Sequence, residues 1–249
     1  MPISANDIKH VRSLQQKKFR KESGLFVVEG IKTVQELINS NIEIDSIYAT
    51  EEFDFLNTVD PNLIHVIKQK ELERISGLRT PNGLLAVAKI PETGSLEWNK
   101  SLVIVLDGIN DPGNLGTIIR TAKWFGIDEV ICSENCADAY DRKVVQSTMG
   151  ALFHVKVHYT NLIDSLQESK SRGYKITGAG MSGKSIYEHQ KQEKQILVIG
   201  SESHGISDEV LDLCDDLKTI PNKETSQKVE SLNAGIATAI FLSELTRPK

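Results

Sequence analysis

The most constraining feature of this sequence is a short apolar run that ends in a polar turn bracketed by glycines. The run Ile196-Leu-Val-Ile199 has the length and character of a strand buried on both faces, and it leads directly into Gly200-Ser-Glu-Ser-His-Gly205. A second strand ends at Pro221 and is followed by a polar loop and a helix that begins at Ser231 or Asn233. Because loops at the carboxyl ends of strands share one crevice, the pattern predicts a binding site there. Ordinary strand-to-helix turns also use Gly, Ser and Asn, so both interpretations stay open on this stretch alone.

Apolar strand-length and helix-length patterns alternate along the whole chain, which predicts an α/β fold. In the first part we expect strands at 25–29, 42–49, 63–67 and 83–88, and helices at 8–19, 31–38, 51–56 and 68–75. In the second part we expect strands at 102–106, 129–132, 155–157 and 174–177 before the run at 196–199, and helices at 114–125, 141–149 and 161–169. Residues 91–95 read as a linker. We therefore expect two domains, at 1–92 and 97–249.

The composition is that of a globular protein with no overall basic field. Hydrophobic residues make up 39% of the 249 residues and charged residues 25%, and the formal net charge is −5. The densest basic run is Lys17-Lys-Phe-Arg-Lys21. It is either a nucleic-acid contact or a solvated helix end where cations are favourable, and the sequence alone favours the second interpretation.

The number of cysteines and the lengths of the apolar runs indicate the cellular compartment. The three cysteines are an odd number, and no charged segment followed by an apolar stretch opens the chain. The longest apolar runs, such as Leu102–Leu106, have the length of strands. We expect a cytoplasmic protein with reduced thiols, no membrane span and no metal site.

The helix expected after the strand 102–106 carries an arginine away from its apolar face. Its core face is Leu115, Ile118, Ala122 and Phe125, whereas Arg120 lies one turn after Gly116 on another face. A glycine is costly inside a helix, by roughly 1 kcal/mol relative to alanine, and is reasonable where something approaches the arginine. Asn114 is the expected N-cap of this helix.

A phosphate-binding pattern supports a competing interpretation. Residues 178–185, Gly-Ala-Gly-Met-Ser-Gly-Lys-Ser, match G-x-x-x-x-G-K-[ST] after an expected strand, so a GTPase is a legitimate alternative. Residues 185–195 supply only Ile186 and Tyr187 as large apolar side chains for the helix that such a loop needs. A base-recognition motif of the Asn-Lys-x-Asp type is also missing. Both points weigh against the nucleotide-binding interpretation.

Three segments taken together resemble the SpoU (TrmH) family of RNA ribose 2′-O-methyltransferases, in the SPOUT superfamily. They are Asn110-Asp-Pro-Gly-Asn114-Leu-Gly-Thr-Ile-Ile-Arg120-Thr-Ala, then Leu197-Val-Ile-Gly-Ser-Glu202-Ser-His-Gly-Ile-Ser, then Ile220-Pro221 with Val229-Glu-Ser231-Leu-Asn233-Ala-Gly-Ile-Ala. The family's order and spacings are kept, so the joint match is specific. Gly24-Leu-Phe-Val-Val-Glu-Gly30 resembles the family's substrate-binding domain, whose fold is shared with RNA-binding ribosomal proteins. The resemblance covers nearly the whole chain.

The resemblance implies a C-terminal domain with a parallel sheet and a deep trefoil knot, and a small N-terminal α/β domain. It also implies S-adenosylmethionine as cofactor and a homodimer that completes each catalytic site across two protomers. By position, the catalytic set is Asn114, Arg120, Glu202, Ser231 and Asn233. The cofactor-binding set, largely through backbone groups, is Thr177, Gly178, Ile199, Gly200, Ile220, Ser231 and Leu232. The transfer itself needs no metal.

The implied chemistry suits these side chains. A ribose hydroxyl loses its proton as it attacks the methyl group, so the site must stabilise a developing alkoxide. A guanidinium stays protonated, so we interpret Arg120 as an electrostatic stabiliser and not as a base. We expect methylation of structured RNA, ribosomal RNA in particular. Transfer RNA is an alternative substrate, and a donor-binding accessory protein in ribosome assembly is an alternative role.

Overall fold

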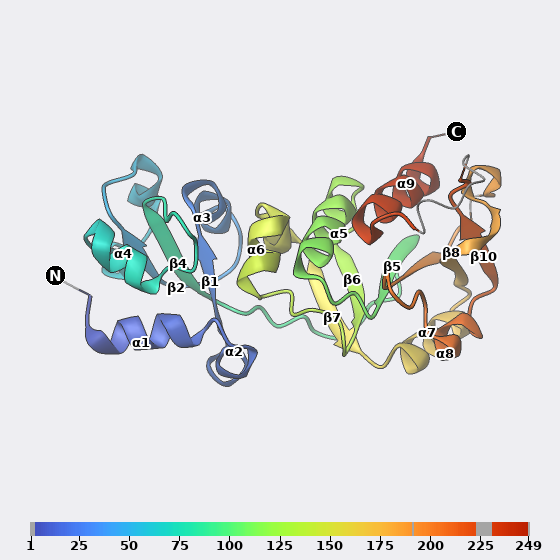
Figure 1. The fold of residues 1–249 in the computed structure, drawn as a ribbon, viewed down its shortest axis with the longest axis horizontal. Coiled ribbons are helices and arrows are strands. Elements are labelled where there is room, and N and C mark those ends of the chain that lie inside the picture. The colour runs from blue at the N-terminus through green and yellow to red at the C-terminus, as the bar shows by residue number, and fades with distance from the viewer. Residues whose placement is uncertain (1–2, 191, 223–230, 249) are drawn as a thin grey trace. The chain divides into compact units, whose positions relative to one another are not determined.

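The computed structural model describes residues 3–190, 192–222 and 231–248 (Figure 1). The chain forms two compact units, each with its own sheet. The first contains residues 1–92 and 138–154, and the second contains 93–137 and 155–249. Residues 138–154 fall within the range that we expected for the second domain, but they pack with the first unit. Among the described residues, no helix is both long and apolar enough to cross a membrane.

The first unit is built on a four-stranded sheet in the order β1-β4-β2-β3. The strands are β1 (Leu25–Glu29), β4 (Leu84–Lys89), β2 (Ile44–Ala49) and β3 (Ile64–Val66). β4 is antiparallel to both of its neighbours, and β2 and β3 are parallel. Its helices are α1 (Ala5–Ser13), α2 (Lys17–Ser23), α3 (Ile31–Ile38), α4 (Gln69–Ile75) and α6 (Arg142–Thr148), with short 3-10 turns at Asp54–Thr58, Pro61–Leu63 and Ala151–His154.

One core of this unit lies between the sheet and the helices α1 and α4. Ile8 and Val11 of α1 meet Leu72 and Ile75 of α4 over Val27, Tyr48, Leu85 and Val87 of the sheet. The alternate residues of β1 and β4, such as Phe26 and Ala86, point to the opposite face and are also buried. Both faces of the sheet are therefore covered.

The second unit is a six-stranded parallel sheet in the order β10-β8-β9-β5-β6-β7. The strands are β5 (Leu102–Asp107), β6 (Glu129–Ser133), β7 (Lys156–Thr160), β8 (Lys175–Ser185), β9 (Gln195–Gly200) and β10 (Asp216–Thr219). The helices are α5 (Pro112–Trp124), α7 (Leu162–Ser171), α8 (Asp208–Leu211) and α9 (Ala234–Thr246), with a 3-10 turn at Ile186–Glu188. The expected α/β fold with a parallel sheet is confirmed.

Helices cover both faces of this sheet, with α5 and α9 on one face and α7 and α8 on the other (Figure 1). Side chains of β5 and β9 are buried at every position from Val103 to Leu106 and from Ile196 to Ile199, as expected for strands covered on both sides. β5 and β9 are neighbours in register, with Asp107 opposite Gly200. Their carboxyl ends therefore open at one point of the sheet edge.

Two expectations about helix ends were wrong. The helix expected at 8–19 is two helices, because the backbone turns at residues 14–16 although Leu14 continues the apolar stripe and is buried. The N-cap of α5 is Asp111, whose carboxylate accepts the backbone N–H of Asn114 at 2.8 Å. Asn114 lies inside the first turn, so its side chain is available for other contacts.

The structure also contradicts the competing phosphate-loop interpretation of 178–185, against which the sequence already weighed. A phosphate loop must leave its strand and wrap around the anion before a helix. Here β8 continues to Ser185, and Lys184 lies in register with Lys218 of the parallel strand β10. A Cβ at Gly183 would lie 2.4 Å from the Leu217 carbonyl oxygen, so close strand packing accounts for that glycine. A short 3-10 turn follows in place of a helix.

Candidate active site

The carboxyl edge of the second sheet holds a cavity of about 680 Å³. Its walls come from the end of β8, the turn after β9, the end of β10 and the start of α9. The lining residues are Ala179–Met181, Ile199–Gly205, Thr219–Asn222, Ser231, Leu232, Ala234, Ala237 and Phe241. The cavity lies at the edge of the sheet that the sequence predicted.

A hydrogen-bonded polar cluster lies at this edge. The side-chain amide of Asn114 donates to Oε1 of Glu202, and the side-chain amide of Asn233 donates to Oδ1 of Asn114 at 2.6 Å. The backbone N–H of Ala234 donates to the same Glu202 oxygen at 3.2 Å. Three of the five predicted catalytic residues, from three separate segments of the chain, therefore meet.

Close contact between α5 and α9 holds the cluster together. Asn233 is the N-cap of α9, and its Oδ1 accepts the N–H groups of Gly235 at 3.0 Å and Ile236 at 3.2 Å. A Cβ at Gly235 would lie 2.8 Å from Cγ2 of Thr117 on α5. The small residue therefore brings the first turns of the two helices into contact, and Asn233 can reach Asn114.

The turn that presents Glu202 is closed by its two glycines. Ser201 and Gly205 exchange backbone hydrogen bonds of 3.0 and 2.8 Å, and Gly205 has a φ of +70°. A Cβ at Gly200 would lie 2.1 Å from the carbonyl carbon of Gly205. A side chain at Gly200 would therefore force the turn open and move Glu202.

The predicted cofactor-binding residues divide into two groups. Ile199, Gly200, Ile220, Ser231 and Leu232 line the cavity, and Thr177 and Gly178 do not. The Thr177 hydroxyl donates to Asp216 at 2.8 Å, and a Cβ at Gly178 would touch Leu217, Cys214 and Ile206. Because β8 continues past both, the strand first reaches the cavity at Ala179. Val229 and Glu230 of the third motif lie outside the described residues.

Sequence reasoning missed the wall that α9 contributes. Ala234, Ala237 and Phe241 line the cavity, with the i, i+3, i+7 spacing of one helical face. That spacing was readable from the sequence, but two alanines and one phenylalanine resemble an ordinary core stripe. Phe241 is buried and serves as core and as cavity wall together.

Arg120 is placed differently from the other predicted catalytic residues. It is exposed on α5 and does not line the cavity of its own chain. Trp124, four residues later on the same face of the helix, is 85% exposed. Ile236 on the adjoining α9 is 54% exposed. The arginine thus lies on the exposed side of α5, one turn from Trp124.

The comparisons with known proteins identify the family of the chain. Residues 101–243 match the model of the SpoU rRNA Methylase family, and residues 5–86 match an MRM3-like substrate binding domain. The chain belongs to the SpoU family. The expectation of an RNA methyltransferase is confirmed with it.

Individual relatives extend over nearly the whole chain. The 23S rRNA (guanosine(2553)-2′-O)-methyltransferase RlmP of Bacillus subtilis is 29% identical over 96% of this chain and 95% of its own. A solved structure assigned to the TrmH family of RNA methyltransferases, from Porphyromonas gingivalis, is 39% identical, covers 98% of each chain and has a TM-score of 0.87. An AdoMet-bound rRNA methyltransferase from Sinorhizobium meliloti is 25% identical with a TM-score of 0.87, over 98% of this chain and 96% of that one.

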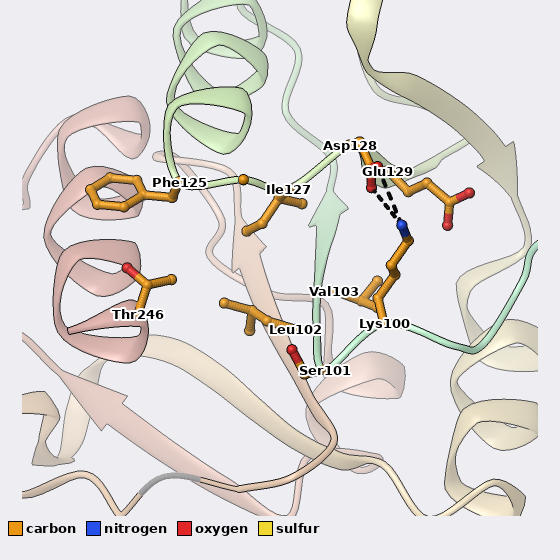
Figure 2. Close-up of a pocket in the computed structure, with 10 residues that line it drawn as sticks. Lys100, Ser101, Leu102, Val103, Phe125, Ile127, Asp128, Glu129 and Thr246 are labelled. Carbon is orange, nitrogen blue, oxygen red and sulfur yellow. Dashed lines mark hydrogen bonds and ion pairs between the residues drawn. The ribbon is translucent and has the colours of Figure 1, made fainter. Parts of the chain in front are cut away.

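A second cavity of about 150 Å³ lies at the other end of the SpoU-family sheet (Figure 2). It is lined by the starts of β5 and β6 and by Phe125 and Thr246 at the ends of α5 and α9. Two of the lining residues, Lys100 and Asp128, form an ion pair at 3.1 Å and lie just before those two strands. In a parallel α/β sheet, ligand sites lie at the carboxyl edge, so we assign no role in catalysis to this cavity.

Proposed function

We propose that the protein transfers a methyl group from S-adenosylmethionine to a ribose 2′-hydroxyl of structured RNA, ribosomal RNA in particular. The observation that carries this proposal is the Asn114–Glu202–Asn233 cluster at the edge of the 680 Å³ cavity. Two relatives support the proposal. RlmP is named as a 23S rRNA 2′-O-methyltransferase, and the Sinorhizobium meliloti enzyme was solved with AdoMet bound.

The cavity fits the methyl donor in size and lining. Cavities of roughly 300–1,000 Å³ with mostly apolar walls are typical of small-molecule sites. Ile199, Ile220, Leu232 and Phe241 offer apolar surface for an adenine ring, between backbone segments that can hydrogen-bond to its edges. When bound, the donor supplies an electrophilic methyl group on a positively charged sulfur. The chain itself has to orient that methyl group and exclude water from it.

The acceptor hydroxyl requires a site for the charge that develops on its oxygen. With the donor bound, this oxygen would take the methyl group from sulfur, leaving a neutral thioether, and would give up its proton to solvent water. A preorganised cation or hydrogen-bond donor beside that oxygen is worth about a hundredfold or more in rate. We assign this role to Arg120, and we assign the positioning of the acceptor to the cluster of Asn114, Glu202 and Asn233, with Ser231 on the cavity wall.

We further propose a homodimer in which Arg120 acts on the partner's cavity. Trp124 on α5 and Ile236 on α9 are large apolar side chains that stay exposed in a single chain, and the two helices are in contact. A two-fold dimer through α5 and α9 would bury both side chains and would place Arg120 of each protomer near the partner's cavity. The trefoil knot and a cytoplasmic location, where ribosomal RNA is made in bacteria, belong to the same proposal.

Complementation between two inactive variants tests the shared site. Arg120→Ala removes the guanidinium and Glu202→Gln removes the carboxylate, and neither variant should transfer methyl groups by itself. If Arg120 acts across the dimer, unfolding and refolding an equal mixture gives mixed dimers with one intact site each, so activity returns to about a quarter of wild type. No recovery in dimers of confirmed mixed composition would place Arg120 in its own chain's site. A light-scattering mass of one chain would contradict the dimer itself.

The RNA substrate is tested by mapping. We expect one 2′-O-methyl group to be missing from ribosomal RNA in cells that lack the protein and to return with the wild-type gene. Loss of a methyl group from transfer RNA alone would replace ribosomal RNA with the alternative substrate. Unchanged methylation in both RNA classes would contradict the proposed function.

A further inference from the structure

Positive charge is concentrated in the first two helices of the first unit. Residues 3–24 contain six Lys and Arg against two Asp and Glu, whereas residues 25–92 contain six against eleven. Five of the six cations in residues 3–24 are exposed: Lys9, Arg12, Lys17, Lys18 and Lys21. A local surface of this kind can attract a polyanion although the whole chain carries a net charge of −5.

Two of the three lysines of α2 occupy positions that are unfavourable for the helix. Lys17 and Lys18 form its first turn, Gln16 makes no side-chain cap, and no acidic residue precedes them in that turn. The positive end of the helix dipole repels cations there. The interpretation of this run as a favourable helix end holds for Lys21, which lies in the last turn of α2, but not for Lys17 and Lys18, because the preceding helix ends at Ser13 and a new one begins at Lys17.

A second unfavourable arrangement lies on the same helix. Lys17 and Lys21 are four residues apart, so two like charges share one face. Lys18 pairs with Glu22 at 3.8 Å, but both side chains remain largely exposed, and such pairs contribute little. The helix dipole at Lys17 and Lys18 and the Lys17–Lys21 spacing therefore do not favour this distribution of charge, whereas binding of an anionic partner would.

Arg20 fixes both helices in place. Its side chain is buried and donates to the carbonyl oxygens of Leu14 at 2.9 Å and Gln15 at 3.0 Å, which closes the turn between α1 and α2. It also donates to Asp138 of the same unit at 3.1 and 2.6 Å. The exposed cations around it therefore stand on a preorganised scaffold, which lowers the entropy lost on binding.

We propose that Lys9, Arg12, Lys17, Lys18 and Lys21 form a phosphate-binding surface that holds the backbone of the substrate RNA; this rests on the proposed function. The contacts are electrostatic and independent of base sequence. A membrane surface fits less well, because an interfacial helix needs a free apolar face, and Ile8 and Val11 of α1 are buried in the core. None of the large exposed apolar side chains lies in residues 3–24.

The test compares two triple variants of the full chain. Lys17→Gln, Lys18→Gln and Lys21→Gln remove the α2 charges; Lys32→Gln, Lys70→Gln and Lys175→Gln remove the same charge from exposed lysines elsewhere. Binding to deproteinised ribosomal RNA and to a 20-base-pair RNA duplex is measured from about 50 to 200 mM salt. We expect the α2 variant to bind both RNAs at least about fivefold more weakly, with a salt slope lower by about 2 to 3. In the control variant, the loss of affinity and the decrease in salt slope should each be less than half of those in the α2 variant.

Further readouts separate this proposal from the proposed function. The α2 variant should bind S-adenosylmethionine like wild type and should melt close to the wild-type temperature, since the three side chains are exposed. Equal losses in the two variants, or a wild-type salt slope in the α2 variant, would overturn the surface while leaving methyl transfer intact. Binding of wild type to phosphatidylserine vesicles but not to RNA would overturn it in favour of a membrane. A wild type that binds RNA through α2 but methylates none would refute only the proposed function.

Discussion

The side-chain amide of Asn233 donates a 2.6 Å hydrogen bond to Asn114, a residue 119 positions earlier in the chain. Asn114 in turn donates to Glu202, so one amide joins two loops that follow different strands. The bridge requires an acceptor on one side of Asn114 and a donor on the other. Only an amide of this length provides both, which makes Asn114 the most sensitive position of the cluster.

We expect Asn114→Asp to lower methyl transfer by about a hundredfold or more, as when a preorganised donor is lost from an active site. The new carboxylate would still accept from Asn233 but would face Glu202 with a like charge. Binding of S-adenosylmethionine should change little, because Asn114 does not line the cavity. Single-turnover transfer and calorimetry measure the two effects. Asn99→Asp is a matched control, because Asn99 also donates to a carboxylate, that of Glu97 at 3.1 Å, outside the site.

The cap of α5 gives a prediction that separates stability from activity. Asp111→Ala should lower the free energy of unfolding by about 1 kcal/mol, the usual effect of losing an N-cap. Asn114→Ala should lower it by much less, because Asn114 is not the cap. Denaturant titration of both variants checks the order. A larger loss of unfolding free energy in Asn114→Ala than in Asp111→Ala would contradict the assignment of Asp111 as the N-cap.

The order and type of most elements could be predicted because each buried strand is an uninterrupted apolar run. β5 and β9 lie within a residue or two of the ranges expected from their sequence. Helix ends were less predictable. Leu14 continues the apolar stripe of α1 through a turn, so periodicity alone could not reveal the break before Lys17. The length of β8 was hidden because glycines and serines suggest loops, whereas pairing with β10 keeps them extended.

The positions of the cluster residues at loop ends could be predicted, but their geometry could not. Local patterns placed Asn114, Glu202 and Asn233 at loop ends, but their meeting depends on the strand order and on the contact of Gly235 with Thr117. Phe241 shows the converse case. Its contribution to the cavity wall depends on which way α9 faces, and an apolar residue in a helix carries no signal that separates cavity lining from core.

The strand conformation of residues 178–185 predicts that the protein does not bind GTP. Lys184 points from an extended strand that pairs with β10, so no loop exists to surround a phosphate. Calorimetric titration with magnesium and GTP should give no heat of binding, and S-adenosylmethionine should bind. Lys184→Ala should leave donor binding unchanged. Tight GTP binding that Lys184→Ala abolishes would restore the nucleotide-hydrolase alternative.

Stability should fall as the pH drops below about 6.5, and His158 should account for part of the loss. Its ring is buried on β7, and among the described residues its Nε2 has no hydrogen-bond partner. Burial, aided by Lys156 and opposed by Glu129, lowers the pKa of His158 below its ordinary value of 6.5. Burial also lowers the pKa of His189.

The sign follows from proton uptake. Below pH 6.5 the unfolded chain takes up a proton on His158 that the folded chain accepts only at lower pH, so protons favour the unfolded state. The contribution is complete above 6.5 and is lost as the pH falls from there toward the folded pKa. Urea titrations at pH 7.5, 6.5 and 5.5 should therefore give decreasing free energies of unfolding, with a smaller decrease in His158→Gln. His10→Gln, at an exposed position on α1, is the control. A decrease of the same size in His158→Gln and wild type would show that other groups cause the loss.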